Sequence, residues 1–168
     1  MAIVHCPPVT VTVREAQPRD FEAVAGLLEE LNRPKVLGTP DEDLHRQRYL
    51  AWLEGADRLG FVAEIDGQVV GFIDMHLIPR LNFIAPQAWV PDLIVRESAR
   101  SRGAGAALLA KAGEAARDRG AFLLSLESAH WRTRAHAFYL REGMLDAAKQ
   151  FVKLLTDVGW PPPPPGSA

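Results

Sequence analysis

The sequence has one cysteine, no long apolar run and almost no net charge. Cys6 alone excludes an internal disulfide and a cysteine-based metal cluster. No apolar run approaches the roughly 20 residues of a membrane-spanning helix, and Pro7-Pro8 interrupts the N-terminus early, which argues against a signal peptide. A formal net charge of −2 provides no basic field for nucleic acid. We therefore expect a cytoplasmic protein that binds neither nucleic acid nor membranes.

The remaining composition is that of an ordinary globular domain. Of 168 residues, 48% are apolar and 24% are charged, which is typical of proteins that bury one core. Pro161 to Pro165 can only be extended polyproline, and the residues after them add no core. We expect a single domain over residues 1–158 and a disordered proline-rich tail over residues 159–168.

Apolar periodicity predicts alternating strands and helices along most of the chain. Asp66-Gly67 favours a tight turn between two strands. The strand–helix–strand unit over residues 89–127 requires a parallel pair, whereas the hairpin requires an antiparallel one. We expect an α/β fold with a mixed central sheet and helices on both faces. The predicted strands cover residues 9–13, 61–65, 68–77, 89–95, 121–127 (buried) and 151–155, and the helices begin near residues 18, 41, 104 and 133, the last capped by Thr133.

The segment Arg100-Ser101-Arg102-Gly103-Ala104-Gly105 lies between a predicted strand and a predicted helix. Free N–H groups at a helix start favour a phosphate anion, although a glycine pair also occurs in turns that hold no ligand. A dinucleotide fingerprint fails, because Leu108 replaces its third glycine and the connection from the strand is too long. An anion-binding turn and a ligand-free turn both remain open at this point.

Together with a later segment, Arg132 to Met144, this turn resembles the GCN5-related N-acetyltransferase (GNAT) family. The family's pyrophosphate loop has Arg or Gln, two residues, Gly, one residue, and Gly or Ala, and residues 100–105 match every fixed position. The resemblance covers the chain to about Leu155. It implies the GNAT fold, with the family's fourth and fifth strands at residues 89–95 and 121–127. It also implies that the backbone of residues 100–105 surrounds the pyrophosphate of acetyl-CoA.

Pro91 supports a cofactor site at the predicted strand over residues 89–95. Proline cannot donate to a strand ladder, so it predicts a bulge, a stop in pairing or an edge strand. The resemblance implies that the pantetheine of the cofactor lies in an opening here, bonded to the backbone of Leu93, Ile94 and Val95. Further cofactor contacts are expected at Arg132, Ala135 and Phe138, although many family members have asparagine where Arg132 stands.

Acetyl transfer to an amine requires two proton transfers. At pH 7 fewer than roughly one in a thousand lysine-like amines is unprotonated, so a base is useful. Asp92 and Glu127 are candidates for that base, as are, more weakly, Asp74 and His76; each also suits an ordinary structural position. Tyr139 matches the tyrosine that in many members protonates the leaving thiolate, although Phe138-Tyr139 also suits a packing pair.

The resemblance implies transfer of an acetyl group from the co-substrate acetyl-CoA to a primary amine by direct attack on the thioester. The acceptor is expected to be a small-molecule amine, a peptide N-terminus or a lysine. No metal is expected, because the five histidines show no zinc-like spacing. Family members often form homodimers. The alternative is a non-catalytic acyl-CoA-binding sensor or partner-binding domain with the same fold.

Overall fold

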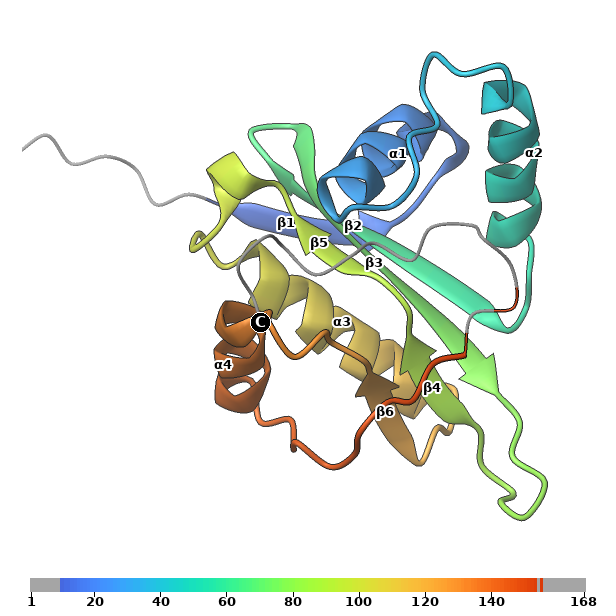
Figure 1. Ribbon diagram of the computed structural model, residues 1–168, viewed down its shortest axis with the longest axis vertical. Coiled ribbons are helices and arrows are strands. Elements are labelled where there is room, and N and C mark those ends of the chain that lie inside the picture. The colour runs from blue at the N-terminus through green and yellow to red at the C-terminus, as the bar shows by residue number, and fades with distance from the viewer. Residues whose placement is uncertain (1–9, 154, 156–168) are drawn as a thin grey trace, which may run out of the picture. The chain divides into compact units, whose positions relative to one another are not determined.

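The structure is a computed structural model that describes residues 10–153 and 155 (Figure 1). The chain divides into two units, one ending at Ser125 and the other beginning at Leu126, and each is described by itself. The expected proline-rich tail, Cys6 and the first two residues of the expected N-terminal strand lie outside the described residues. No helix in residues 10–153 is long and apolar enough to span a membrane.

The first unit is built on a mixed β-sheet. The strand order is β1-β2-β3-β4-β6, and β5 also pairs with β3. The pairs β1–β2, β2–β3, β3–β4 and β3–β5 are antiparallel, whereas β4 and β6 run in the same direction (Figure 1). The expected mixed sheet is therefore confirmed. The strands are β1 (Val11–Glu15), β2 (Arg58–Ile65), β3 (Gln68–Ile78), β4 (Gln87–Val90), β5 (Leu93–Val95) and β6 (Leu123–Leu126).

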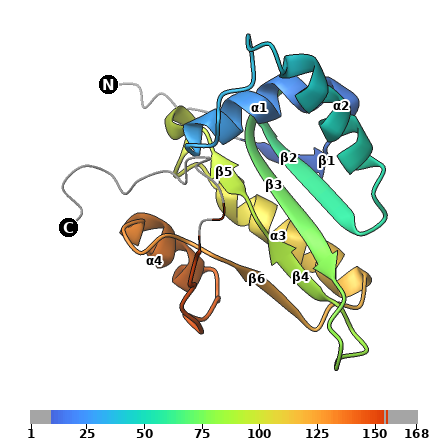
Figure 2. The same ribbon diagram turned by 45° about the vertical axis from the view of Figure 1, so that its right-hand side comes forward.

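Helices cover both faces of this sheet. α1 (Phe21–Glu30) and α2 (Glu42–Leu53) lie over one face and α3 (Ala104–Asp118) over the other, as Figures 1 and 2 both show. On the first face, apolar side chains of α1 and the residue after it pack on three strands to form one cluster: Val24, Leu27, Leu31, Val62, Phe72 and Ile94. On the second face, a Cβ added at Gly71 would come within 3.0 Å of Leu108 Cδ1, so α3 packs tightly on β3.

The turns contain glycine and aspartate at the positions where the sequence predicts them. Asp66 and Gly67 have φ angles of 52° and 75°, which are the left-handed values of the predicted tight turn. Short 3-10 turns precede α1 and α3, at Pro18–Asp20 and Glu97–Ala99. Gly120, with φ of 71°, follows the end of α3 as expected.

Two predictions about strands are wrong. The strand expected to be buried over residues 121–127 is the shorter β6, and its Leu123 side chain is 42% exposed. Because β6 ends the strand order, it has one neighbour where a central strand has two. Residues 151–153 of the expected last strand have no regular structure, and Leu154 lies outside the described residues. Apolar residues alone do not form a strand, because a strand also needs a hydrogen-bonding partner.

The second unit contains α4 (Thr133–Arg141). Thr133 is the first helical residue rather than the cap. Arg132 occupies the cap position, since its carbonyl accepts the N–H groups of Ala135 and His136 at 2.9 and 3.1 Å. Gly143, with φ of 85°, lies just past the end of the helix as predicted.

Candidate functional site

The predicted strand over residues 89–95 is broken at Pro91-Asp92 into β4 and β5. Trp89 on β4 pairs with His76, and Leu93 on β5 pairs with Ile73. Between these pairs the Asp74 N–H donates to the Asp92 carbonyl at 3.1 Å, but the Asp92 N–H donates to the Asp74 side chain, Oδ1, at 2.9 Å. A side-chain carboxylate thus replaces a backbone acceptor at the position after Pro91. The expected interruption at Pro91 is confirmed.

Beyond the break, β5 has an edge that faces away from β3. The N–H of Arg96 donates to the Val70 carbonyl at 2.8 Å, and the Asp92 carbonyl accepts the Asp74 N–H. Antiparallel pairing alternates along a strand, so Ile94 also directs its backbone groups toward β3. The backbone groups of Leu93 and Val95 therefore point to the other edge. In the described part of the chain β3 is the strand neighbour of β5, which leaves that edge without a paired strand.

The Arg100 to Gly105 segment follows β5 and leads into α3. Gly103 occupies the cap position of the helix with φ of 90°, and Ser101 also has a positive φ, of 63°. Residues 100–103 are exposed, and a Cβ added at Gly103 would have no heavy atom within 4 Å. The first N–H groups of an α-helix have no acceptor within the helix, and the helix dipole favours an anion there. The segment is therefore suited to hold a phosphate group.

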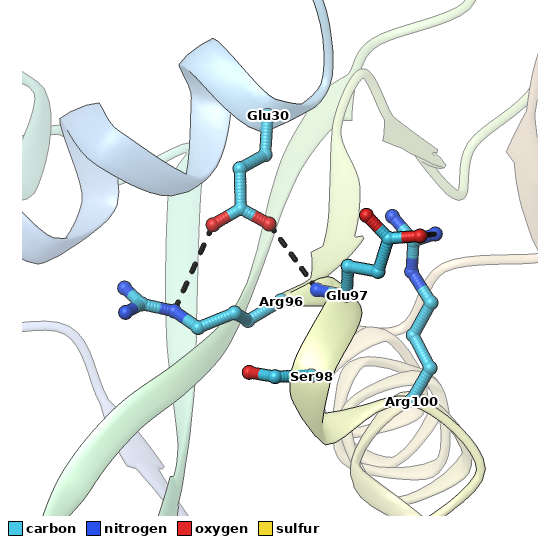
Figure 3. A pocket seen from close by; sticks show the side chains of 5 residues that line it. All are labelled: Glu30, Arg96, Glu97, Ser98 and Arg100. Atoms are coloured by element: carbon cyan, nitrogen blue, oxygen red, sulfur yellow. Dashed lines mark hydrogen bonds and ion pairs between the residues drawn. The ribbon is translucent and has the colours of Figure 1, made fainter.

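A shallow pocket of about 610 Å³ lies where this segment begins, and Figure 3 shows the side chains that line it. Glu30 reaches from α1 to the pocket, with 3.7 Å between its Oε1 and Arg96 Nε, and it accepts the Glu97 N–H at 3.2 Å. Arg100 donates from Nε to the Val95 carbonyl at 3.2 Å. The Arg100 side chain therefore bridges the open edge of β5 and the start of the anion-binding segment.

Acidic, imidazole and indole groups gather beside the strand break. Asp74 and His76 lie on the face of β3 that α2 covers, and Asp74 Oδ2 is 3.6 Å from His76 Nε2. The Trp52 indole N–H donates to the same His76 nitrogen at 3.5 Å. Arg33 donates to Asp92 Oδ1 from both Nε and Nη2, at 2.8 and 2.5 Å. The sequence analysis missed Arg33 and Trp52 as members of this site.

The surroundings change how strongly Asp74 holds a proton. Burial raises the pKa of the Asp74 carboxyl above its ordinary value, and the nearby Asp92 charge adds to this effect. The neighbouring His76 imidazole and the hydrogen bond from the Asp92 N–H oppose the rise in the Asp74 pKa without cancelling it. Asp74 is therefore a stronger base than an ordinary aspartate. Within residues 10–153 and 155, no three His, Cys, Asp or Glu side chains are grouped to hold a metal ion.

The other residues singled out from the sequence lie in the second unit. Glu127 is exposed and directly follows β6. Ala135, Phe138 and Tyr139 are partly buried residues of α4, and the Phe138 and Tyr139 rings lie 5.3 Å apart in an edge-on arrangement. Burial raises the pKa of the Tyr139 phenol, and the Arg132 charge opposes the rise. Tyr139 is consequently protonated, and able to donate, at neutral pH.

Comparison with known proteins identifies a family and a related enzyme that resemble this chain over most of its length. A profile of the Acetyltransferase (GNAT) family matches residues 24–144. An aminoalkylphosphonate N-acetyltransferase from Salmonella typhimurium is 32% identical over 143 residues, which cover 85% of this chain and 90% of that protein.

Solved structures share the fold at lower identity. A transcriptional regulator from Bacillus halodurans superposes with a TM-score of 0.77 at 22% identity, over 86% of this chain and 99% of that one. An aminoglycoside N-acetyltransferase in complex with CoA gives a TM-score of 0.74 at 19% identity, over 90% of this chain and 98% of that one.

Proposed function

Because this chain belongs to the GNAT family of acetyltransferases, we propose that it transfers an acetyl group from acetyl-CoA to a primary amine. The observation that carries the proposal is the open edge of β5, which leads directly into an exposed segment suited to bind phosphate. These two features provide backbone groups for an extended chain and for an anion, in the order in which pantetheine and pyrophosphate occur in coenzyme A. The amine then attacks the thioester directly.

The cofactor is held mainly by backbone groups in this proposal. The N–H groups of residues 100–105 surround the pyrophosphate, and each charge-assisted hydrogen bond contributes about 1.5–3 kcal/mol. The backbone of Leu93 and the Val95 N–H bond to the pantetheine beside the Val95 carbonyl that accepts from Arg100, while Ile94 packs under α1 and supports the strand. Contacts from Arg132, Ala135 and Phe138 complete the proposed cofactor site, as the family resemblance implies.

Two protein groups move protons during the reaction. A carboxylate receives a proton from the amine; Asp92, which lies at the strand break, and Glu127 are the candidates from sequence, and Arg33 bonds to Asp92 Oδ1. Tyr139 gives its proton to the departing thiolate, and the raised pKa of its phenol keeps that proton in place until the thiolate forms.

The charges near the strand break support a cationic acceptor. Asp74 and Asp92 favour a cationic group, which an alkylammonium provides. An aminoalkylphosphonate is the first acceptor to test, because the relative from Salmonella typhimurium carries that name and is covered over 90% of its length. A cytoplasmic location, a homodimer and a single domain over residues 1–158 stay predictions.

Cofactor binding is tested by calorimetric titration with acetyl-CoA and with free CoA. The Gly103→Val variant introduces a branched side chain at φ of 90° in the anion-binding segment. The matched control is Gly120→Val, at the other end of α3, where φ is 71° and the added Cβ also has open space. We expect Gly103→Val to weaken acetyl-CoA binding at least tenfold and Gly120→Val to leave it unchanged. No binding to folded wild-type protein would refute the cofactor assignment.

Catalysis is tested by CoA release with aminomethylphosphonate and with sisomicin as acceptors. Tyr139→Phe should lower kcat about 100-fold while leaving the Kd for acetyl-CoA unchanged, because only the acid is lost. Tyr49→Phe, which removes the other tyrosine hydroxyl of the chain, is the control and should retain turnover. Equal turnover of the two variants would remove Tyr139 from the mechanism. Cofactor binding without transfer to any amine would favour the non-catalytic alternative.

A further inference from the structure

The geometry at Asp74 divides the two oxygens of its carboxylate between two tasks. Oδ1 accepts the Asp92 N–H at 2.9 Å and so closes the gap in the ladder after Pro91. Oδ2 faces His76 Nε2 at 3.6 Å. The Asp74 side chain is 13% exposed and the His76 side chain 27%, so the imidazole is the more accessible of the two. A proton reaching His76 from solvent is thus close to a carboxylate that holds protons well.

Aromatic groups fix the position of the imidazole. The Trp52 and Trp89 rings lie 6.3 and 5.8 Å from the His76 ring. The Trp52 N–H donates to His76 Nε2, which requires a lone pair on that nitrogen. In this arrangement His76 is neutral, and Nε2 accepts a proton when the Trp52 N–H releases its lone pair. When it does so, the new N–H is directed toward Asp74 Oδ2.

Among the described residues, the charged groups nearest to the Asp74 and His76 side chains come from the strand break and from β2. Asp92 and its partner Arg33 lie on the side of the strand break. On β2, Gly60 is the register partner of Asp74 and Arg58 that of His76, and the Arg58 guanidinium lies 3.8 Å from Asp57. From α2 the pair meets Trp52, which is uncharged.

We infer that Asp74 and His76 form the proton-accepting pair for the attacking amine, and that Trp52 is the residue that positions the imidazole. This inference rests on the proposed acetyl transfer and assigns its base. Asp92 is the weaker candidate because both hydrogen bonds from Arg33 converge on its Oδ1. The two acceptors share one proton, so the pH dependence belongs to the pair rather than to either residue.

The proton balance of the step is complete. The ammonium gives one proton to the pair, directly or through a water molecule, and its nitrogen gains a lone pair. That lone pair forms the new N–C bond while the C–S bond breaks and the electron pair leaves on sulfur. The thiolate gains a proton from Tyr139, and the second proton that the nitrogen loses passes through solvent to the Tyr139 phenolate, which restores the phenol. One net proton returns from the pair to solvent.

The decisive variant is Asp74→Asn, because its side-chain oxygen can still accept the Asp92 N–H but cannot take a proton. With aminomethylphosphonate, or whichever amine the wild-type protein acetylates, we expect kcat to fall about 100-fold. We also expect the acid limb of the kcat/KM profile to move to lower pH, because the imidazole no longer has the carboxylate beside it. The Kd for acetyl-CoA should not change. A purely structural role for Asp74 would leave the acid limb where it is.

A second pair of variants tests the positioning role of Trp52. Trp52→Phe keeps an aromatic ring beside Phe72 but removes the N–H that bonds to His76. We expect it to shift the acid limb of the kcat/KM profile and to lower thermal stability only slightly. Gly60→Ala displaces the Trp52 ring, whose Cζ3 and Cη2 atoms would lie 2.8 and 2.4 Å from the new Cβ, and should reproduce the shift. An unchanged acid limb in both variants would overturn the positioning role.

One further readout needs no activity. Nitrogen NMR of the imidazoles, assigned with a His76→Gln variant, should show the His76 ring gaining its second proton at lower pH in Asp74→Asn than in the wild type. Independence of that pH from Asp74 would overturn the pair. Wild-type protein that binds acetyl-CoA but acetylates no amine would overturn the proposed function instead. Full turnover with an unmoved acid limb in Asp74→Asn would overturn the base assignment alone.

Discussion

Asp20 and Asp74 are both largely shielded from solvent in the first unit, yet their surroundings act on them in opposite ways. The Asp20 side chain is 4% exposed and receives two hydrogen bonds from Arg14, at 2.6 and 2.8 Å, and one from the Gln17 N–H at 2.8 Å. Burial acts to raise the pKa of Asp20, but these hydrogen bonds outweigh it and the pKa is lowered. Asp74 instead lies beside a second carboxylate, and the groups that contact it are the Asp92 N–H and His76, so burial prevails and its pKa is raised.

The difference separates a carboxylate that stabilises the fold from one suited to proton transfer. A fully paired carboxylate stays charged. The hydrogen bonds of Asp20 join the turn before α1 to Arg14 on β1, and Arg14 also bonds to Glu64 on β2. A carboxylate without a cationic partner gains little from staying charged and binds protons readily. Burial by itself therefore does not identify a functional acid; the partners within hydrogen-bonding distance do.

The largest expected effect is on the structural side of this comparison. Asp20→Ala should lower the free energy of unfolding at pH 7 by about 3 kcal/mol, because Arg14 is left partly buried with one carboxylate partner instead of two. Urea denaturation at pH 7 measures the change. Glu64→Ala is the matched control and should cost less, since Glu64 is 21% exposed. Equal losses in the two variants would contradict the special role of Asp20.

Asp74→Asn should act in the opposite direction on stability. A raised pKa means that the folded state favours the protonated acid, so this contribution is fully present below the unfolded pKa of about 3.9 and is lost as pH rises through the folded value. Asparagine resembles the protonated acid at every pH. We expect the variant to be about 1 kcal/mol more stable than the wild type at pH 8 and equal to it near pH 3.5. A loss of stability at pH 8 would contradict the assigned direction.

The pH dependence of Asp20 should have the reverse sign. Its lowered pKa gives stability that is present above about pH 3.9 and is lost as pH falls through the folded value. The stability difference between the wild type and Asp20→Ala should therefore shrink on acidification. Thermal unfolding of Asp20→Ala and Asp74→Asn, each measured against the wild type between pH 7 and pH 3, tests both directions. If the two stability differences changed in parallel with pH, the contrast between these acids would be removed.

The smallest expected effect concerns Arg33, which pairs with Asp92 beside the Asp74 site. The Arg33 side chain is 38% exposed, and pairs of that kind contribute less than about 1 kcal/mol to stability. We expect Arg33→Met to lower kcat less than tenfold and to leave the acid limb of the pH profile in place. A fall as large as that of Asp74→Asn would instead assign the base role to Asp92.

Local chemistry explains which parts of the site were predictable. Pro91 has no N–H, so an interruption of the strand follows from the residue itself. Gly103 in the anion-binding segment and Gly67 in the tight turn occupy left-handed backbone conformations that few other residues adopt. Apolar periodicity predicted α1 and α3 because each packs one apolar face on the sheet, whereas α2 was predicted from the acids at its start and has no buried residue. The predicted last strand is absent over residues 151–153, because the apolar residues there specify no pairing partner.

The sequence by itself determined the family, the mixed α/β fold, the interruption at Pro91 and the turn that opens α3. Each of these depends on properties of residues close together in the chain. The tertiary structure alone decided that Arg33 bonds to Asp92, 59 residues away, and that Trp52 bonds to His76, 24 residues away. It also decided which buried aspartate has a cationic partner. A proton affinity depends on the groups within a few ångströms in space, and folding determines which groups those are.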